Sequence, residues 1–489
     1  MTSFTQKPLY KIANPQSIVF FGASNNAIRM GSLMLDATLA LGYEGKIYPV
    51  HPKEDTVAGF TAYRRVMDIP IIPDLAILVL PTDIVADTLE ECGQKGIGHA
   101  IIVSGGFSET NAKGKKQEKR LQAIADRYSI RFLGPNCLGV INTYHRFNPT
   151  PIKADGFPGF IGLASQSGSF LTQMFNYLHL NGMGFSTGFS VGNEANIDIV
   201  ECMEYLGDCP NTKVIALYIE GITRGRAFIK AAKKIVPHKP IVALYVGGSE
   251  AGRKAGFSHT GSMAGPDEIY DGMFRQAGII RAKSLSEMFD FCLALGNLPA
   301  PKGNRVVIQT HSGGPGATAA DACGRSGLEL PGLSEETIKK LSPLIPHTAS
   351  INNPVDMTFS KNMLSEFNDI PDALLGDPNT DILMIYFLNP NIFLQGIMEQ
   401  SGLSVEEAQD KTKDIIKGIS EQLFEVKVKH DKPLVGYTYR SLQEDPVKTM
   451  LQKGIPIYND PERAAHALQA LITYYGYKKR QEGGQWENH

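Results

Sequence analysis

Residues 17–26 read Ser-Ile-Val-Phe-Phe-Gly-Ala-Ser-Asn-Asn, and this stretch decides the fold class. The apolar run that starts at Ser17 is typical of a buried strand, and the Gly/Ser/Asn turn after it precedes a helix predicted to begin near Arg29. Short apolar runs then alternate with longer amphipathic segments along the chain. That alternation is typical of βαβ units, so we predict an α/β protein built on parallel sheets.

The same strand, turn and helix pattern occurs at residues 160–169 (FIGLASQSGS) and 306–316 (VVIQTHSGGPG). Superposing Ser167-Gly168 on Ser312-Gly313 aligns Ser165 with Thr310, which predicts two similar domains. N–H groups at a helix N-terminus attract phosphate, so two such turns could hold one phosphoryl group between them. The candidate phosphate-binding residues are Ser165, Ser167, Gly168, Ser312, Gly313 and Gly314. Two ordinary βα turns are the alternative.

Two Pro/Gly-rich joints, residues 148–159 and 296–304, divide the chain into blocks of similar size. A length of 489 residues predicts about three domains, at about 150 residues each. We therefore expect domains at residues 1–150, 151–300 and 301–477. The charged segment 478–489 is expected to be a mobile tail or to dock on a partner.

Composition excludes several classes of protein. The formal net charge of −2 gives no general attraction to nucleic acid or to an anionic membrane. The six cysteines are scattered without metal-ligand spacing, so we predict free thiols, no metal site and a reducing, cytoplasmic location. The N-terminal residues lack the apolar core of a signal peptide, and no run is long enough to span a membrane.

The glycine loop of the first block predicts a nucleotide site at Gly22, Ala23, Ser24 and Asn25. The dinucleotide fingerprint G-x-G-x-x-G is missing, and Pro52-Lys53 follows the next strand where an NAD site would have an acid. A cation there favours a nucleotide with an extra ribose phosphate, meaning coenzyme A or NADP. A solvated Lys53 is the alternative.

Three further turns in this block follow predicted strands, at Pro81, at Ser104-Gly105 and at Asn136. Ligands of open α/β sheets bind outside the carboxyl ends of the strands, so these turns and the glycine loop are expected to line one crevice.

A catalytic pair is predicted in the second block. His259 lies in Phe-Ser-His-Thr-Gly-Ser-Met-Ala-Gly (257–265), where small residues leave the imidazole approachable, as a phosphoryl acceptor requires. Glu220 ends the apolar run 214–219, and another such run, 241–246, precedes the histidine loop. If these strands are neighbours, Glu220 emerges at the same sheet edge and can fix the tautomer of His259. A surface turn and a solvated glutamate are the alternatives.

Two overlapping G-x-S-x-G matches at residues 184–192 resemble the nucleophile elbow of serine hydrolases. They fall inside an alternating run, so we predict a glycine-rich strand and no hydrolase.

Eight motifs in order resemble those of the α subunit of NDP-forming acyl-CoA synthetases, relatives of succinyl-CoA synthetase that include ADP-forming acetate–CoA ligase. The resemblance extends to about residue 475. The motifs are Phe21-Gly22-Ala23-Ser24, Gly134-Pro135-Asn136-Cys137-Leu138-Gly139, Ser165-Gln166-Ser167-Gly168, Val191-Gly192-Asn193, Tyr218-Ile219-Glu220-Gly221, Ser258-His259-Thr260-Gly261, Asn353-Pro354-Val355-Asp356 and Gly454-Ile455-Pro456-Ile457-Tyr458. His51 departs from the family, in which Asn commonly precedes Pro-Lys.

The resemblance implies a Rossmann-like CoA-binding domain followed by two flavodoxin-like domains. It implies that His259 is the phosphohistidine, that Glu220 supports it, and that the two Ser-Gly turns grip the phosphoryl group. The implied reaction is acid + CoA + NTP ⇌ acyl-CoA + NDP + phosphate, with CoA bound by the first domain. The acid, and the choice of ADP or GDP, stay open.

The chain has no G-x-x-x-x-G-K-[ST] motif and nothing left over for a nucleotide-handling domain. The resemblance therefore implies a partner, an ATP-grasp β subunit that holds ATP or GTP with Mg²⁺ in an αβ or α₂β₂ enzyme. Two alternatives from other classes are an NADP-linked oxidoreductase and a non-catalytic CoA-binding sensor.

Overall fold

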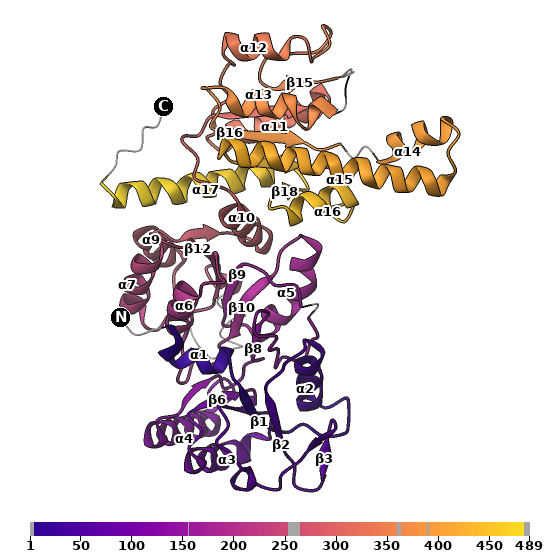
Figure 1. Cartoon of the computed structure of the whole chain (residues 1–489). Helices are drawn as coiled ribbons and strands as arrows, with labels where there is room; N and C mark the ends of the chain where they lie inside the picture. The colour runs from indigo at the N-terminus through magenta and orange to yellow at the C-terminus, as the bar shows by residue number, and fades with distance from the viewer. Residues whose placement is uncertain are drawn as a thin grey trace. The chain divides into compact units, whose positions relative to one another are not determined.

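A computed structural model describes residues 4–154, 156–252, 265–358, 362, 364–388 and 391–483 of the chain. The chain divides into two compact units, which Figure 1 follows from indigo to yellow. Unit 1 comprises Met1–His179 and Met183–Met288, and unit 2 comprises Leu180–Gly182 and Phe289–His489. Three main sheets are therefore distributed over two units, with two sheets in unit 1.

The first sheet of unit 1 is parallel, with strand order β2-β1-β5-β6-β7. Ligands of such a doubly wound sheet bind where the strand order reverses, here between β1 and β5. Its strands are β1 (Ser17–Phe21), β2 (Lys46–Val50), β5 (Leu75–Leu78), β6 (His99–Ile102) and β7 (Arg131–Leu133), accompanied by η1 (Phe4–Gln6), α1 (Pro8–Ala13), α2 (Met30–Ala40), the hairpin β3 (Thr56–Val57) and β4 (Phe60–Thr61), η2 (Val66–Asp68), α3 (Thr82–Lys95) and α4 (Ala112–Tyr128).

Helices α3 and α4 pack side by side against this sheet, at the indigo end of Figure 1. Alternate strand residues such as Val19, Ala76 and Ile102 share one apolar core with Leu89 of α3 and Leu121 of α4. Because side chains on a strand alternate between faces, every second residue meets the helices.

The second sheet of unit 1 has the order β13-β12-β11-β9-β10-β8. Five strands are parallel, and β8 pairs antiparallel with β10. The elements are β8 (Val140–Asn142), β9 (Ile161–Ser165), β10 (Phe185–Ser190), β11 (Val214–Ile219), β12 (Ile241–Tyr245) and β13 (Ile280–Ala282), with α5 (Gly168–Leu180), α6 (Ile199–Asp208), α7 (Gly225–Ile235) and α9 (Asp267–Ala277). The hydrolase-like matches lie on β10 and its ends, as predicted.

The two sheets of unit 1 are joined by backbone hydrogen bonds. Asn193 N donates to Pro135 O over 2.9 Å, and Ala195 N donates to Gly134 O over 3.2 Å. Gly192, directly before Asn193, has φ +61, and a Cβ on this residue would come within 2.3 Å of Pro135 O. Strand β8 also lies before residue 150 but belongs to the second sheet, so the chain passes from one sheet to the next earlier than the predicted boundary at 150.

Unit 2 contains one parallel sheet of order β15-β14-β16-β17-β18, the flavodoxin-like order. Its strands are β14 (Val306–Thr310), β15 (Val355–Asp356), β16 (Ile382–Tyr386), β17 (Leu434–Tyr437) and β18 (Ile457–Tyr458). Its helices are the greater part of α10 (Leu285–Asn297, which enters unit 2 at Phe289), α11 (Gly313–Arg325), α12 (Glu335–Leu341), η3 (Leu364–Glu366), α13 (Asp369–Gly376), α14 (Asn391–Gln400), α15 (Val405–His430), α16 (Asp445–Gln452) and α17 (Pro461–Gln481).

Helix α10 is fastened to unit 2 by a buried ion pair. Arg463 Nε and Nη2 donate to the two carboxylate oxygens of Asp290, each over 2.7 Å, and Tyr458 Oη donates to Asp290 O. The two units divide between Met288 and Phe289, within α10. At the other end, α17 continues to Gln481, past the predicted start of the tail at residue 478, and residues 484–489 lie outside the described residues.

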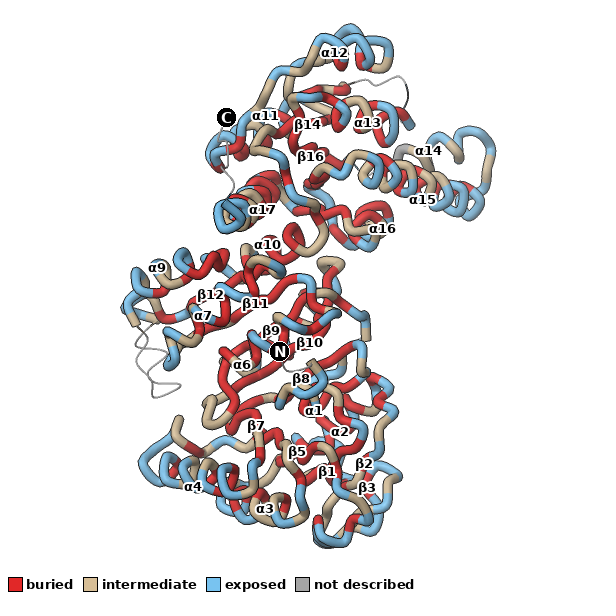
Figure 2. The backbone as a smooth tube through the Cα atoms, turned by 60° about the vertical axis from the view of Figure 1, so that its left-hand side comes forward, coloured by how far each residue is buried: buried red, intermediate tan, exposed pale blue. Residues whose placement is uncertain are grey.

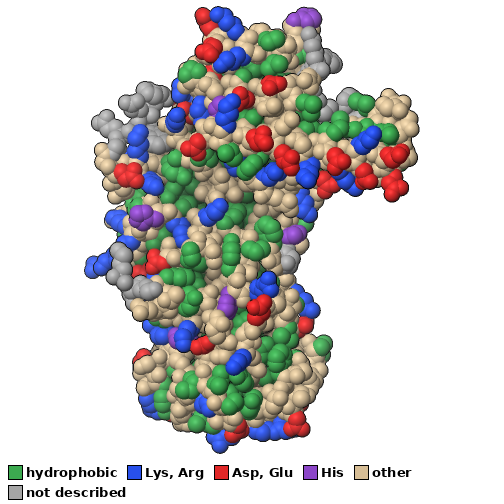
Figure 3. All heavy atoms as spheres, viewed as in Figure 1, with side chains coloured by type: hydrophobic (Ala, Val, Ile, Leu, Met, Phe, Trp, Pro, Cys, Tyr) green, Lys and Arg blue, Asp and Glu red, His purple; other side chains and the backbone are tan. Residues whose placement is uncertain are grey.

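Most strand residues of the three main sheets are buried, and the exposed residues lie mainly on the outer faces of the helices and on loops (Figure 2). On the face drawn in Figure 3, acidic and basic side chains are intermixed, in keeping with the small net charge. All six cysteines are buried and unpaired. Among the described helices, none is long and apolar enough to cross a membrane.

Candidate functional site

Two strand-to-helix turns carry the candidate phosphate-binding residues. In unit 1, β9 ends at Ser165 and α5 begins at Gly168; in unit 2, β14 ends at Thr310 and α11 begins at Gly313. The buried hydroxyls of Ser165 and Thr310 each donate to the carbonyl oxygen two residues ahead, over 2.7 and 2.8 Å. These equivalent bonds confirm the predicted alignment of the two residues.

Because these two hydroxyls are used inside the turns, the groups that can meet a phosphate are those at the helix starts. The first N–H groups of a helix have no partner within it and carry partial positive charge. Ser167 is half-buried beside the start of α5, and Ser312, the N-cap of α11, makes no side-chain capping bond. A Cβ built on Gly314 would meet nothing within 4 Å, so α11 begins in open space on that side.

Glu220 directly follows β11, next to β9 at the point where the strand order of the second sheet reverses. Gln166 holds this position: its Oε1 accepts from the backbone N–H of Glu220 over 2.5 Å and of Gly221 over 3.0 Å, and its Nε2 donates to Gly221 O over 2.7 Å. On its other side, β11 pairs with β12, the strand that precedes the histidine loop. The predicted pairing of β11 and β12 is therefore confirmed. Gln166 thus ties the candidate carboxylate to the turn before α5.

Glu194 is a half-buried residue whose carboxyl group belongs to the same network. Its Oε2 accepts from Gln166 Nε2 over 2.9 Å, and its Oε1 accepts from Ile199 N, at the start of α6, over 2.7 Å. Burial raises the pKa of Glu194 to about 7, even though both hydrogen bonds favour the ionised form. A perturbed carboxyl beside a candidate site is a typical functional feature.

In unit 2, His311 has the position that Gln166 has in unit 1. It lies between the end of β14 and Ser312, the N-cap of α11. Its Nδ1 is 3.3 Å from Glu366 Oε2, and both side chains are largely buried. Burial lowers the pKa of His311 to about 4, so the ring is neutral at pH 7 and can still donate its Nδ1 proton to the carboxylate. Thr358 Oγ1 lies 3.2 Å from His311 O and 2.6 Å from Asp356 Oδ1, and these contacts link the turn to the adjacent strand β15.

The glycine loop lies at the switch point of the first sheet, between β1 and β5. Gly22 has φ +93, and a Cβ there would come within 2.0 Å of Val79 O, so only glycine fits. Ala23 and Ser24 are buried, and Ser24 N and O both bond Ser32 Oγ of α2. Asn25 is the exposed member of the loop. This tight cradle suits the close approach of a phosphate group.

Pro52 and Lys53 are exposed after β2, as an ionic contact to a ribose phosphate requires. The next residue, Glu54, accepts from Asn25 N over 3.0 Å through its Oε2. His51 Nδ1 accepts from Lys53 N and Glu54 N. His51, which replaces the Asn common in the family, therefore shapes this turn.

The three remaining turns meet at the carboxyl edge of the first sheet, as predicted. Ser104 Oγ donates to Leu80 O over 2.6 Å, next to Pro81, and Ser104 O accepts from Asn136 N over 2.9 Å. A Cβ on Gly105 would lie 3.2 Å from Asn136 Oδ1. These residues therefore lie beside one another at this edge and form the lining of the candidate crevice.

Asn193 connects this lining to the second sheet. Its Nδ2 donates to Glu109 Oε2 over 2.6 Å and to Glu118 Oε2 over 2.9 Å, and its Oδ1 accepts from Asn136 Nδ2 over 3.2 Å. Burial opposes ionisation of Glu109, but hydrogen bonds from Asn193 and from the backbone of Gly106 and Phe107 hold its pKa below the usual value. The motif containing Asn193 was recognised in the sequence, but its partners depend on contacts between distant turns.

His259 and the rest of residues 253–264 lie outside the described residues. Within the described parts, no group of three or more His, Cys, Asp or Glu is arranged to hold a metal ion.

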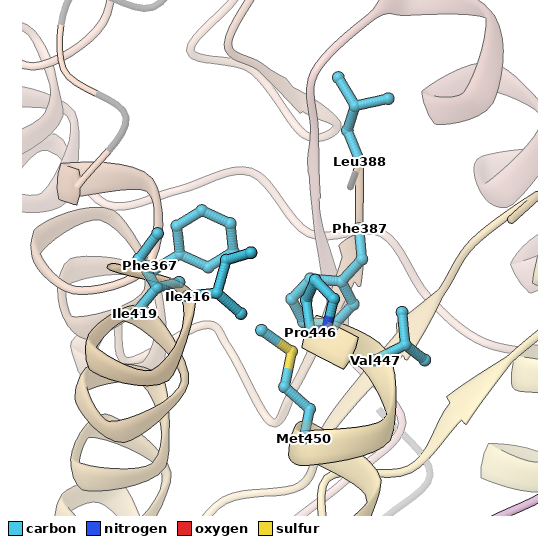
Figure 4. A pocket seen from close by; sticks show the side chains of 8 residues that line it. All are labelled: Phe367, Phe387, Leu388, Ile416, Ile419, Pro446, Val447 and Met450. Carbon is cyan, nitrogen blue, oxygen red and sulfur yellow. The ribbon is translucent and has the colours of Figure 1, made fainter. Parts of the chain in front are cut away.

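Figure 4 shows an apolar cavity in unit 2, between α15 and α16. It is lined by Phe367, Phe387, Leu388, Ile416, Ile419, Pro446, Val447 and Met450. Its volume of about 10 Å³ is too small for anything larger than one water molecule, and it offers no polar partner. It is a packing gap and not a substrate site.

Comparisons with known proteins cover the chain almost completely. A family model described as "Succinyl-CoA ligase like flavodoxin domain" matches residues 158–295, and one described as "CoA binding domain" matches residues 16–143. The chain is 39% identical to the acetate–CoA ligase [ADP-forming] II subunit alpha of Pyrococcus furiosus, over 94% of this chain and 96% of that one. It is 35% identical to the acetate–CoA ligase [ADP-forming] of Methanocaldococcus jannaschii, over 96% of this chain and 64% of that one.

A solved structure is similar along the same length. The dinucleotide forming acetyl-coenzyme A synthetase 1 of Ca. Korarchaeum cryptofilum, determined in complex with phosphate and ADP, matches with a TM-score of 0.85 and 30% identity. The match covers 98% of this chain and 99% of that one.

Proposed function

This chain belongs to the α-subunit family of the ADP-forming acid–CoA ligases, and we propose that it works through a phosphohistidine at His259. The protein is an acid–thiol ligase, and coenzyme A is one of its substrates. Its reaction is carboxylic acid + CoA + NTP ⇌ acyl-CoA + NDP + phosphate. The relatives reported above are ligases, which disfavours both the NADP-linked oxidoreductase and the non-catalytic CoA sensor.

In the proposed sequence of steps, His259 carries the phosphoryl group between the nucleotide and the acyl phosphate, from which the CoA thiol displaces phosphate. Dividing the reaction in this way is nucleophilic catalysis by an activated histidine. Glu220 holds one ring nitrogen of His259, which leaves the other nitrogen as the nucleophile. We propose the first N–H groups of α5 and, separately, those of α11 as phosphate-binding groups.

The observation that carries this proposal is the placement of Glu220. It lies at the reversal point of the second sheet, and Gln166 ties its backbone to the turn before α5. A carboxylate and a helix N-terminus are thereby held at one sheet edge, where β12 also ends before the histidine loop.

For coenzyme A, we propose the crevice of the first sheet as the binding site. Gly22, Ala23, Ser24 and Asn25 would receive a phosphate group, and Lys53 after Pro52 would pair with another. Pro81, Ser104, Gly105 and Asn136 would line the rest of the crevice. The positive φ of Gly22 and its close packing against Val79 support this assignment, because they form a tight turn that only glycine allows at the switch point of the sheet.

The α-subunit family implies a β partner, and we propose that this partner is an ATP-grasp subunit that binds ATP or GTP with Mg²⁺. The proposed assembly is αβ or α₂β₂. The chain spans 64% of the Methanocaldococcus jannaschii ligase, so that relative contains substantial sequence beyond the part matched here. The acid substrate is a small carboxylic acid; the name of the Pyrococcus relative supports acetate.

The test is the rate at which Glu220→Gln becomes phosphorylated by acetyl phosphate. We expect a rate about a hundredfold below that of the unsubstituted protein, which is typical for loss of a group that orients a nucleophile or accepts its proton. Affinity for CoA, measured by calorimetry, should be unchanged. Glu204→Gln, an exposed position on α6, is the matched control. An unchanged rate in Glu220→Gln would contradict the assigned pair.

A further inference from the structure

The side-chain amide of Gln166 connects three segments of unit 1. Its Oε1 accepts from the backbone N–H groups of Glu220 and Gly221, and its Nε2 donates to Gly221 O and to Glu194 Oε2, over 2.5 to 3.0 Å. A primary amide has two N–H donors and an oxygen with two lone pairs, so these four bonds use its whole capacity. The amide can make all four bonds in only one of its two orientations.

Glu194 is the side chain that this amide bonds. Its other carboxyl oxygen, Oε1, accepts from the backbone N–H of Ile199 at the start of α6, over 2.7 Å. Both oxygens therefore face N–H donors, an arrangement that an ionised carboxylate satisfies fully and a protonated carboxyl group only in part. The backbone of Glu194 has φ +56, a strained value that persists only where the surrounding contacts hold the residue.

The two N–H donors of the Glu194 carboxyl group are neutral, whereas the charged side chains around it are paired with one another. The surrounding titratable groups are two ion pairs and one thiol: Asp198 with Arg224, Glu201 with Arg131, and Cys202. Burial raises the pKa of the Cys202 thiol well above its usual value. Burial also raises the pKa of Glu194 to about 7, so this carboxyl group changes its charge near neutral pH.

We propose that Glu194 is a positioning residue for Glu220. Its carboxylate holds the Gln166 amide in the orientation that fixes the end of β11 against the turn before α5. Glu220 is thereby held beside the helix N-terminus assigned to phosphate binding. The inference rests on the phosphorylation of His259 proposed above, and it adds a residue that controls this step without touching the reacting atoms.

Protonation of Glu194 would favour the opposite orientation of the amide. A protonated carboxyl group is itself an O–H donor, and Gln166 Oε1 could accept from it if the amide turned over. The Nε2 group would then face the backbone N–H groups of Glu220 and Gly221, so donors would meet donors. The end of β11 would lose its acceptor, and phosphorylation should therefore be slower in the protonated protein.

The experiment compares the unsubstituted chain with Glu194→Gln in the rate at which radiolabelled acetyl phosphate labels His259, from pH 6 to pH 8.5. Glutamine has the size of glutamate but no carboxylate at any pH, so the variant resembles the protonated protein. The ratio of the two rates should rise from about twofold at pH 6 to about tenfold at pH 8.5, as expected for loss of a hydrogen bond to a charged group.

Taking the ratio removes the ionisation of His259 itself, which affects both proteins alike. Glu204→Gln, an exposed position on α6, is the matched control and should give a ratio of one at every pH. A ratio for Glu194→Gln that does not change with pH would overturn the proposal, because a purely structural defect would slow the reaction equally across this range.

A second variant tests whether the effect passes through Gln166. Gln166→Met removes the amide, so adding Glu194→Gln to it should leave the rate at pH 8.5 unchanged. A further tenfold loss in the double variant would contradict transmission through Gln166. Thermal unfolding checks that both proteins are folded. If Gln166→Met does not fold, the pH dependence of the ratio for Glu194→Gln decides the proposal by itself.

The same measurements separate this inference from the phosphohistidine. An unsubstituted chain that takes up no label on His259 would contradict the phosphohistidine, and the role of Glu194 with it. Normal labelling of His259 with a constant rate ratio would contradict the role of Glu194 alone.

Discussion

Glu194 has a strongly perturbed pKa and belongs to the hydrogen-bond network that holds the backbone of Glu220. Its carboxyl group lies between the Gln166 amide and the start of α6, and the residue has φ +56, an uncommon value for a residue with a side chain. Burial raises its pKa to about 7, against 4.5 for an ordinary glutamate. The folded state therefore keeps a proton that the unfolded state releases between these pH values.

This pKa predicts a falling contribution to stability as pH rises from 4.5 to 7. In that interval the unfolded state binds fewer protons than the folded state, so the free energy of unfolding decreases, by up to about 3 kcal/mol. Glu194→Gln has no such ionisation, so the variant should become more stable than the unsubstituted chain as pH rises. The difference between their free energies of unfolding should grow from near zero at pH 4.5 to its full value above pH 7. Denaturant unfolding at several pH values measures this difference, with Glu204→Gln as control. A difference that does not change with pH would show that Glu194 ionises normally.

Single residues differ in how far the sequence could predict them. The equivalence of Ser165 and Thr310 followed from aligning two turns, because both hydroxyls bond within their own turn. The roles of Gln166 and Glu194 did not follow, since they depend on which strands lie side by side. Glu54 was missed for the same reason: its contact with Asn25 joins residues on two different strand ends.

At the scale of elements, the side chain of Asn193 connects its own turn to the turns that contain Glu109 and Asn136. Its amide nitrogen separates the carboxylates of Glu109 and Glu118, while its amide oxygen accepts from Asn136. These contacts join the carboxyl edge of the first sheet to the strand end of β10. The candidate CoA crevice and the Glu220 turn are thereby held in one unit.

Asn193→Asp tests this junction. The substitution replaces the donating amide nitrogen by a carboxylate oxygen, which places a third carboxylate beside Glu109 and Glu118. We therefore expect a loss of about 2 kcal/mol in the free energy of unfolding at pH 7.5. The loss should shrink at pH 4, because repulsion among the three carboxylates of the variant favours uptake of a proton. Urea unfolding at both pH values is the measurement, and Asn211→Asp, in the turn before β11, is the control. Equal losses at the two pH values would exclude repulsion among the carboxylates as the cause.

Element types were largely predictable, but their assignment to sheets was not. Apolar runs and Gly/Ser turns located β1, β9, β11, β12 and β14. Strand β8 is three residues long and pairs antiparallel with a strand that comes later in the chain, so no local pattern marks it. Helix α10 joins unit 2 through the Asp290–Arg463 pair, whose partners are far apart in sequence.

On the scale of the whole molecule, the prediction concerns which subunit binds CoA and which subunit uses the nucleotide. We expect the purified chain to bind CoA but not to form ADP from ATP, because phosphoryl transfer from a nucleotide needs groups that hold Mg²⁺ and the terminal phosphates. Acid- and CoA-dependent ADP formation should begin when the β subunit is added. The assay is a coupled ADP measurement with and without that subunit. Turnover of ATP by the chain alone would contradict the subunit assignment.

The central claim is that His259 carries the phosphoryl group, and the most direct measurement is covalent labelling. Incubation with radiolabelled acetyl phosphate, or with labelled ATP and the β subunit, should give a phosphate bond that is labile in acid and stable in base, as a phosphoramidate is. Peptide mapping should place the label on His259, and His259→Ala should abolish it while CoA binding persists. Label that survives in His259→Ala, or an unlabelled but catalytically active enzyme, would contradict the phosphohistidine mechanism.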